Sequence, residues 1–145
     1  MMVQYIIAIL GWIATAIGWI VAYFLQVSTL KKQLVIDEVK HISSTIRECT
    51  EKYIEYSQCA PPGDKAQLNE LQIIMLMDRI IVNVHRQKKK GRCLNIDIPL
   101  NKYYEVITGD KFGSEDRNYI TKERLKRAFS DGELLIENAE SSINQ

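Results

Sequence analysis

The sequence predicts an all-α protein: one transmembrane helix that continues into a small helical bundle. Two observations predict this class. The first is an uncharged apolar stretch at residues 3–27, since no Asp, Glu, Lys, Arg or His lies between Met1 and Leu30. The second is that apolar residues recur at helical spacings of three and four through most of the remaining chain, between turn signals rich in Gly and Pro.

Residues 1–30 are predicted to form the transmembrane helix. About 25 helical residues reach about 37 Å, at about 1.5 Å per residue, which exceeds a hydrocarbon core of about 30 Å. A secretory signal peptide is the main alternative, but it would begin with basic residues and have a shorter apolar region. Lys31 and Lys32 follow the stretch and no basic residue precedes it. The positive-inside rule therefore predicts a single pass with the N-terminus outside and the C-terminal domain in the cytoplasm.

Small side chains form a stripe along this predicted span. They are spaced 3, 4, 3 and 4 residues apart, so they share one helical face, and small residues let helix backbones approach closely in lipid. This pattern predicts a membrane seam through which the span self-associates. The alternative is chance, because small residues are frequent in membrane helices. The membrane seam consists of Ala8, Gly11, Thr15, Gly18 and Ala22.

Residues 31–145 have the size of one domain and hold all of the Lys, Arg, Asp and Glu residues. The formal net charge of +1 predicts no long-range attraction to nucleic acid. The three cysteines, Cys49, Cys59 and Cys93, lack CxxC and CxxH spacing, so we expect free thiols in a reducing cytoplasm. No metal site or cofactor is predicted, because the sequence contains no phosphate-binding loop, HExxH or GxSxG motif.

The first cytoplasmic helix is predicted over residues 31–60. Its apolar residues repeat at spacings of 4, 3, 4 and 3, which is typical of a coiled-coil seam. Such a seam can pack against a partner chain or against other helices of the same domain. Polar residues between its members, such as Ser43 and Glu48, are predicted to face away from it. This juxtamembrane seam includes Val39, Ile42, Ile46, Cys49 and Tyr53.

Three further helices are predicted, at residues 64–90, 98–109 and 121–140. Asp64 and Asp97 are expected to cap the first two, and Thr121 the last. The helix 64–90 is apolar on several sides, which predicts a central position in the bundle.

Two glycines are expected to have structural roles in these helices. Gly91 is placed to end the helix 64–90. Gly132 lies on the apolar face of the last helix, where it would allow a neighbouring helix to approach closely.

Three lysines, Lys88, Lys89 and Lys90, stand at the C-terminal end of the helix 64–90. Their simplest role is to complement the negative end of the helix dipole. A binding site for nucleic acid or anionic lipid is the alternative.

The chain has only two histidines, and Arg79 precedes one of them, His85, by six residues. This spacing is similar to the loose R-x4-6-H signature of HEPN-type ribonucleases, which are also helical bundles. The resemblance implies that His85 moves a proton while Arg79 holds a phosphate or stabilises developing charge. On one unbroken helix, however, the two side chains lie about 120° apart. We expect a degenerate HEPN-like domain without activity rather than an enzyme.

The whole layout resembles small single-pass bacterial membrane proteins of anti-phage defence. The nearest type is the membrane accessory protein of type VI-B CRISPR systems. The resemblance rests on the N-terminal segment GWIATAIGWIVAYFLQ, the long helix that follows it, and the Arg79–His85 pair. It implies a homo-oligomeric, pore-like assembly in the bacterial inner membrane.

Three functions are therefore predicted as alternatives. The first is an oligomeric effector that permeabilises or depolarises the inner membrane in anti-phage defence. The second is a membrane-tethered HEPN-like ribonuclease that uses Arg79 and His85. The third is a passive anchor or adaptor whose helical domain recruits a soluble protein partner.

Overall fold

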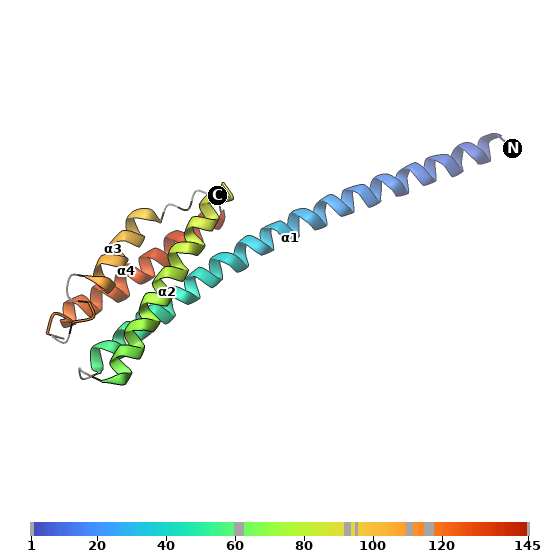
Figure 1. Ribbon diagram of the computed structural model, residues 1–145. Coiled ribbons are helices and arrows are strands. Elements are labelled where there is room, and N and C mark those ends of the chain that lie inside the picture. The colour runs from blue at the N-terminus through green and yellow to red at the C-terminus, as the bar shows by residue number, and fades with distance from the viewer. Residues whose placement is uncertain are drawn as a thin grey trace. The chain divides into compact units, whose positions relative to one another are not determined.

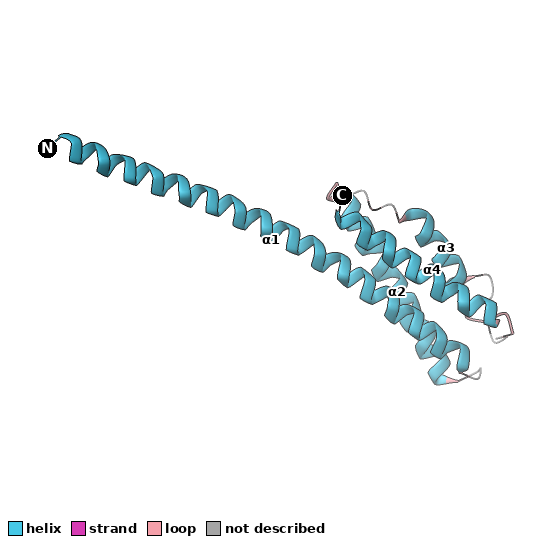
Figure 2. Ribbon diagram, turned by 180° about the vertical axis from the view of Figure 1, so that it is seen from behind, coloured by secondary structure: helices cyan, strands magenta, loops and turns pink. Residues whose placement is uncertain are grey.

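A computed structural model describes residues 2–59, 63–91, 94, 96–109, 112–114 and 118–144. All regular secondary structure in these residues is helical (Figures 1 and 2), which confirms the all-α class. The elements are α1 (Met2–Gln58), α2 (Asp64–Lys89), α3 (Asp97–Thr108), α4 (Lys122–Ser141) and a short 3-10 helix, η1 (Ser142–Asn144). The chain divides into two compact units, Met1–Asp37 and Glu38–Gln145.

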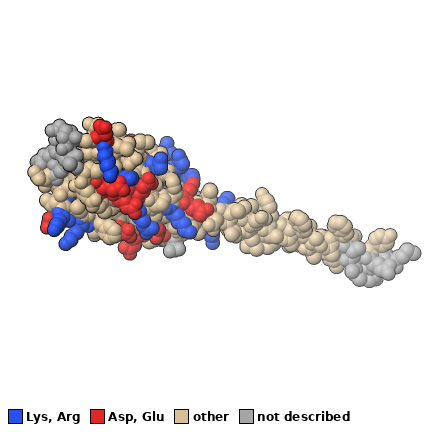
Figure 3. Space-filling view, turned by 90° about the horizontal axis from the view of Figure 1, so that it is seen from below, with Lys and Arg blue, Asp and Glu red and all other residues tan. Residues whose placement is uncertain are grey.

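The first unit is the N-terminal part of α1, and its described apolar side chains are exposed. Trp12 is 79% exposed and Trp19 is 78% exposed. Before Lys31 this helix carries no charged side chain, and its described side chains are correspondingly tan in Figure 3. Among the described residues, this is the one helix that is long and apolar enough to cross a membrane, and none of its most apolar window is buried.

The second unit is built around one hydrophobic core, to which the C-terminal part of α1 and the helices α2, α3 and α4 all contribute. The juxtamembrane seam of α1 lies in this core, with its members no more than 1% exposed. Of the two alternatives for the seam, the structure thus shows packing against helices of the same domain. The helical core residues are Val39, Ile42, Ile46, Cys49, Tyr53 and Tyr56 of α1; Ile73, Leu76, Met77, Ile80 and Val84 of α2; Leu100, Tyr103 and Ile107 of α3; and Ala128, Leu135, Ile136 and Ala139 of α4.

The α1 face that contacts this core is wider than the seam alone. Glu48 is exposed, as predicted, but Ser43 is 2% exposed and Thr50 is 7% exposed. The prediction that Ser43 faces solvent is therefore wrong. A helix that packs against more than one neighbour buries residues on both sides of its apolar stripe.

The predicted central position of α2 is also wrong. One face of α2 is buried in the core, but large apolar side chains on the opposite face and on one flank remain exposed. These exposed residues are Leu68, Leu71, Ile74, Met75, Ile81 and Val82.

The helix ends agree with the predicted bounds to within one or two residues, but the caps agree only in part. Thr121 caps α4, because its hydroxyl accepts a hydrogen bond from the Arg124 backbone N–H at 3.2 Å. Asp64 and Asp97 are instead the first residues of their helices, where a carboxylate still complements the positive end of the helix dipole. Gly91 follows α2 with φ of 76°, a left-handed conformation that glycine adopts without strain.

Candidate functional site

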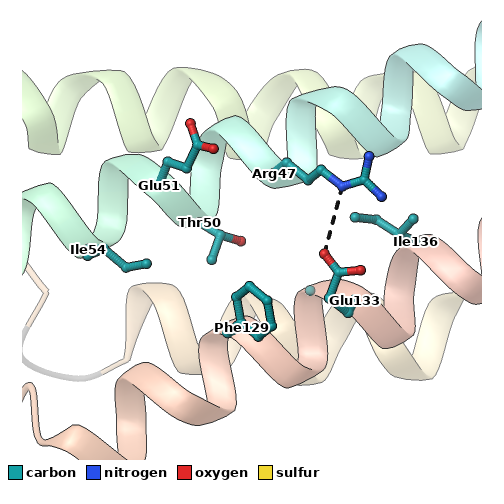
Figure 4. A pocket seen from close by; sticks show the side chains of 8 residues that line it. Arg47, Thr50, Glu51, Ile54, Phe129, Glu133 and Ile136 are labelled. Carbon is teal, nitrogen blue, oxygen red and sulfur yellow. Dashed lines mark ion pairs between the residues drawn. The ribbon is translucent and has the colours of Figure 1, made fainter.

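A surface cleft of about 140 Å³ lies between α1 and α4 (Figure 4). Apolar side chains of both helices form its walls, and Arg47 and Glu133 face each other across it in an ion pair of 3.7 Å. Both charged side chains are about half exposed, so this pair contributes little to stability. The lining residues are Arg47, Thr50, Glu51, Ile54, Phe129, Gly132, Glu133 and Ile136.

Gly132 forms the floor of the cleft because α1, α3 and α4 approach one another there. A Cβ atom added at Gly132 would lie 3.1 Å from Thr50 Oγ1 and 3.3 Å from Tyr103 Cε2. Thr50 Oγ1 donates to the Ile46 carbonyl at 3.0 Å and lies 2.8 Å from the Tyr103 hydroxyl. The close approach predicted at Gly132 is thus present, and hydrogen bonds hold the group that a methyl would meet.

Gly132→Ala is expected to destabilise the protein by about 1 kcal/mol. Alanine gains about 1 kcal/mol of helix propensity over glycine, but overpacking a fixed neighbour costs about 1–3 kcal/mol. The measurement is denaturant unfolding of the intact chain in detergent. Ser130→Ala, at an exposed position of α4, is the control and should stay within about 0.5 kcal/mol. A Gly132→Ala protein as stable as its parent would show that Thr50 can move aside.

Cys49 is buried beside this contact, and Cys59 is half-buried near the end of α1; both are free thiols. Cys93 lies outside the described residues. Burial raises the pKa of the Cys49 thiol to about 11, and burial also raises the pKa of the Tyr103 hydroxyl. Cys49 is therefore a protonated core residue at neutral pH and not a nucleophile.

Alkylation with iodoacetamide at pH 8 is expected to modify Cys59 in the folded protein and to leave Cys49 unmodified. Thiolate is the reactive form, and Cys49 is both inaccessible and protonated at this pH. Peptide mass mapping before and after denaturation measures the difference, with both residues modified once the chain is unfolded. Equal modification of the two in the folded protein would contradict the burial of Cys49.

Arg79 and His85 are both exposed on α2, and the structure does not bring them together. The helix is continuous between them, so their side chains lie about 120° apart. Neither residue lines the α1–α4 cleft or the two larger, more open hollows beside Arg124. Their geometry gives no support to the ribonuclease hypothesis. Among the described residues, no group of three or more His, Cys, Asp or Glu side chains is placed to hold a metal ion.

In the predicted membrane seam, Gly11, Thr15, Gly18 and Ala22 are exposed, and the Ala8 side chain lies outside the described part of the chain. A Cβ atom added at Gly11 or Gly18 would meet nothing within 4 Å. Thr15 donates its hydroxyl proton to the Gly11 carbonyl at 2.8 Å, so its polar group is satisfied within the helix. The surface along these residues is therefore open to a neighbouring helix. The Thr15 hydroxyl needs no water molecule as a hydrogen-bond partner.

Two of the three lysines at the C-terminal end of α2 have acidic partners. Lys88 pairs with Asp97, and Lys90 pairs with Glu38, which also accepts a hydrogen bond from Gln87 at 2.8 Å. These contacts reduce the positive charge available for nucleic acid or anionic lipid. Figure 3 shows charges of both signs side by side on the visible face of the second unit.

The role of Arg124 was missed by the sequence reasoning. Its Nε donates to the Val106 carbonyl at 2.9 Å and its Nη2 donates to the Glu105 carbonyl at 3.2 Å. The guanidinium also lies 5.1 Å from the centroid of the Tyr119 ring. A cation at the C-terminal end of α3 satisfies carbonyls that the helix leaves without partners. No sequence pattern indicates this contact, because Arg124 comes from a different helix.

Comparisons with known proteins found no matching family model, no similar curated protein and no similar solved structure. Nothing in them links the chain to CRISPR accessory proteins or to HEPN-like domains, and that resemblance stays a prediction.

Proposed function

We propose that this protein is a single-pass membrane protein whose N-terminal helix crosses the bacterial inner membrane and joins several copies. The observation that carries the proposal is the exposure of α1 on every side over residues 9–26. Exposed apolar surface costs about 25 cal/mol per Å² in water, whereas it is the expected surface of a helix in lipid. The basic residues Lys31 and Lys32 favour a cytoplasmic location for the second unit, which we propose to be a small helical bundle.

Assembly of the span is supported by the small residues along one of its faces. Gly11 and Gly18 leave open space at which a second backbone can approach, and close packing is what holds helices together in lipid. A single helix cannot conduct ions, so any effect on permeability requires several copies around an axis. Thr15 and the tryptophan positions would then line a narrow, largely apolar constriction of the kind that gates by dewetting.

The activity that we propose for this assembly is permeabilisation or depolarisation of the inner membrane when it is triggered. A role in anti-phage defence rests on the resemblance of layout alone. The adaptor alternative predicts instead that an unrelated apolar helix can replace the span without loss of function, because a passive anchor needs only a hydrophobic helix of sufficient length.

The test exchanges residues 3–27 for an unrelated apolar helix of the same length. The replacement helix contains too few small residues for close packing between helices. We expect the exchanged protein to stay in the membrane, to become smaller in mild detergent and to lose its effect on membrane potential after induction. Full retention of function would favour the adaptor. A strictly monomeric parent protein at cellular concentration would contradict the proposed assembly.

A further inference from the structure

The outer face of α2 carries exposed apolar side chains together with two opposite charges. Leu68 is 55% exposed, Met75 63% and Val82 55%. At about 100° per residue, Leu68 and Val82 point within about 20° of the direction of Met75. Asp78 and Arg79 are also exposed, and they point about 60° to one side and about 40° to the other side of Met75. The face is therefore an apolar stripe with a carboxylate on one edge and a guanidinium on the opposite edge.

The two charges on the edges of this stripe have no partner within the chain. Neither Asp78 nor Arg79 belongs to an ion pair in the described part of the protein. They cannot pair with each other, because adjacent positions of a helix do not face one another. An exposed apolar stripe with unpaired charges along its edges is typical of a helix that contacts another helix.

The direction of α2 restricts how two copies can meet at this stripe. In the second unit, α2 runs antiparallel to α1, since Gln87 donates to Glu38 at 2.8 Å and Asn69 donates to the Cys59 Sγ at 3.6 Å. The helix α1 is continuous from Met2 to Gln58. Copies of a single-pass protein in one membrane share one orientation, so a symmetric pair of them has its two-fold axis along the membrane normal. Two α2 helices related by that axis run in the same direction and in register.

We propose that α2 pairs in parallel with α2 of a second copy of this chain, with the apolar stripes in contact across the two-fold axis. The inference rests on the proposed insertion in a membrane, but it does not use the membrane seam. Across such an axis, one edge of each stripe meets the opposite edge of the other. Asp78 of each copy then faces Arg79 of the other, and two reciprocal ion pairs flank the contact of Met75 with its equivalent.

An antiparallel pair would have different electrostatics. It would bring the two Asp78 edges to the same side of the contact and the two Arg79 edges to the other side. Like charges in facing positions destabilise helix pairs. Charge complementarity therefore favours the parallel pair, as does a common orientation in the membrane.

The parallel pair also brings Asp64 towards Asp64 and Arg86 towards Arg86 of the second copy. Both residues lie eleven positions from Met75 in the sequence, which is about 16 Å along the helix. Two helices that cross near Met75 have moved apart at that distance. We therefore expect contact over about four turns, from Leu68 to Val82.

An interface of this length is small beside the roughly 800 Å² per partner of a stable complex. Confinement of both copies to one membrane compensates in part, because it raises their effective concentration. Covalent trapping is therefore a better measurement of this contact than size.

The test uses single cysteines in the full-length chain, in isolated membranes, with Cys59 and Cys93 changed to Ser. Cys49 is kept, because it is buried. Met75→Cys and Val82→Cys are each expected to form disulfide-linked homodimers under mild oxidation, since each position faces its own equivalent. Ile81→Cys is the matched control, because it is exposed on α2 but about 120° away from Met75. Met75→Cys dimers no more abundant than Ile81→Cys dimers would overturn the proposal.

A mixture of Leu68→Cys and Val82→Cys chains separates the two directions of pairing. These positions are 14 residues apart, or about 21 Å along the helix, so a parallel pair cannot form the mixed disulfide. A mixed disulfide more abundant than the Val82→Cys homodimer would show antiparallel pairing and overturn the proposal.

A charge exchange provides a second readout that does not alter the apolar residues. In the Met75→Cys chain, Asp78→Arg is expected to reduce dimer yield several-fold, because two guanidinium groups would then face each other on each edge. Adding Arg79→Asp to the same chain exchanges the two charges and should restore the yield. A yield that stays low in the exchanged chain, with intact helices by circular dichroism, would contradict the reciprocal ion pairs.

Two further measurements separate this pair from the proposal on which it rests. Carbonate extraction shows whether the chain is in the membrane. Recovery in the soluble fraction would contradict both proposals, whereas a membrane-bound chain without excess Met75→Cys dimers would contradict the α2 pair alone. Gly11→Leu with Gly18→Leu is expected to leave the Met75→Cys dimers unchanged. Their loss in that variant would show that they depend on the membrane seam, and would overturn a separate α2 contact.

Discussion

Ile46→Asp is expected to unfold the unit formed by residues 38–145. Ile46 is completely buried, and its Cγ2 atom lies 3.7 Å from the position of a Cβ at Gly132. A buried carboxylate without a partner costs several kcal/mol, or takes up a proton with a raised pKa. That cost is a large part of the roughly 5–15 kcal/mol that stabilises a typical domain. Thermal and denaturant unfolding of the intact chain in detergent, followed by circular dichroism, measures the loss.

Glu48→Ala is the control for this substitution, because Glu48 is exposed only two residues away on the same helix. It should change the free energy of unfolding by no more than about 0.5 kcal/mol. If the two substitutions had equal effects, the core assigned to α1 would be incorrect.

Gly11→Leu combined with Gly18→Leu is expected to break up the proposed membrane assembly without preventing insertion. Both glycines have open space around them in the single chain, so the added side chains meet nothing until a second helix approaches. In lipid the loss comes from steric exclusion and lost van der Waals contact between helices. Insertion itself should improve, because leucine favours the helix centre by about 0.5 kcal/mol.

The readouts are oligomer size in mild detergent and membrane potential after induction. We expect the oligomer to dissociate and any depolarisation to fall with it. Ile9→Leu combined with Ile20→Leu conserves side-chain volume and should change neither. If the glycine variant had the same oligomer size and the same membrane potential as the parent, the membrane seam would not be the interface between the spans.

The helices and the α1 core face could be predicted because both depend on local spacing. Val39, Ile42 and Ile46 repeat at helical intervals, and the apolar pattern alone indicates which face is buried. Their partner could not be predicted, because a seam of this kind fits another chain as well as another helix of the same chain.

The errors on α2 have the same origin. Leu71 and Met77 are similarly apolar, yet only Met77 is buried, because the arrangement of the other helices decides which side of α2 is covered. The exposed Leu71 side therefore became visible only in the structure. The contacts of Arg124 with the end of α3 could likewise not be predicted from local spacing, since they join residues 18 and 19 positions apart.

The central claim is that residues 3–27 cross a membrane, and thiol labelling on both sides tests it most directly. One chain carries Met2→Cys with Cys59 and Cys93 changed to Ser, and the other keeps Cys59 and has only Cys93 changed. In intact spheroplasts, a membrane-impermeant maleimide is expected to label Met2→Cys at once and Cys59 only after permeabilisation. Cys49 should remain unlabelled throughout because it is buried. Labelling of Cys59 in intact spheroplasts, or recovery of either chain in the soluble fraction, would contradict the claim.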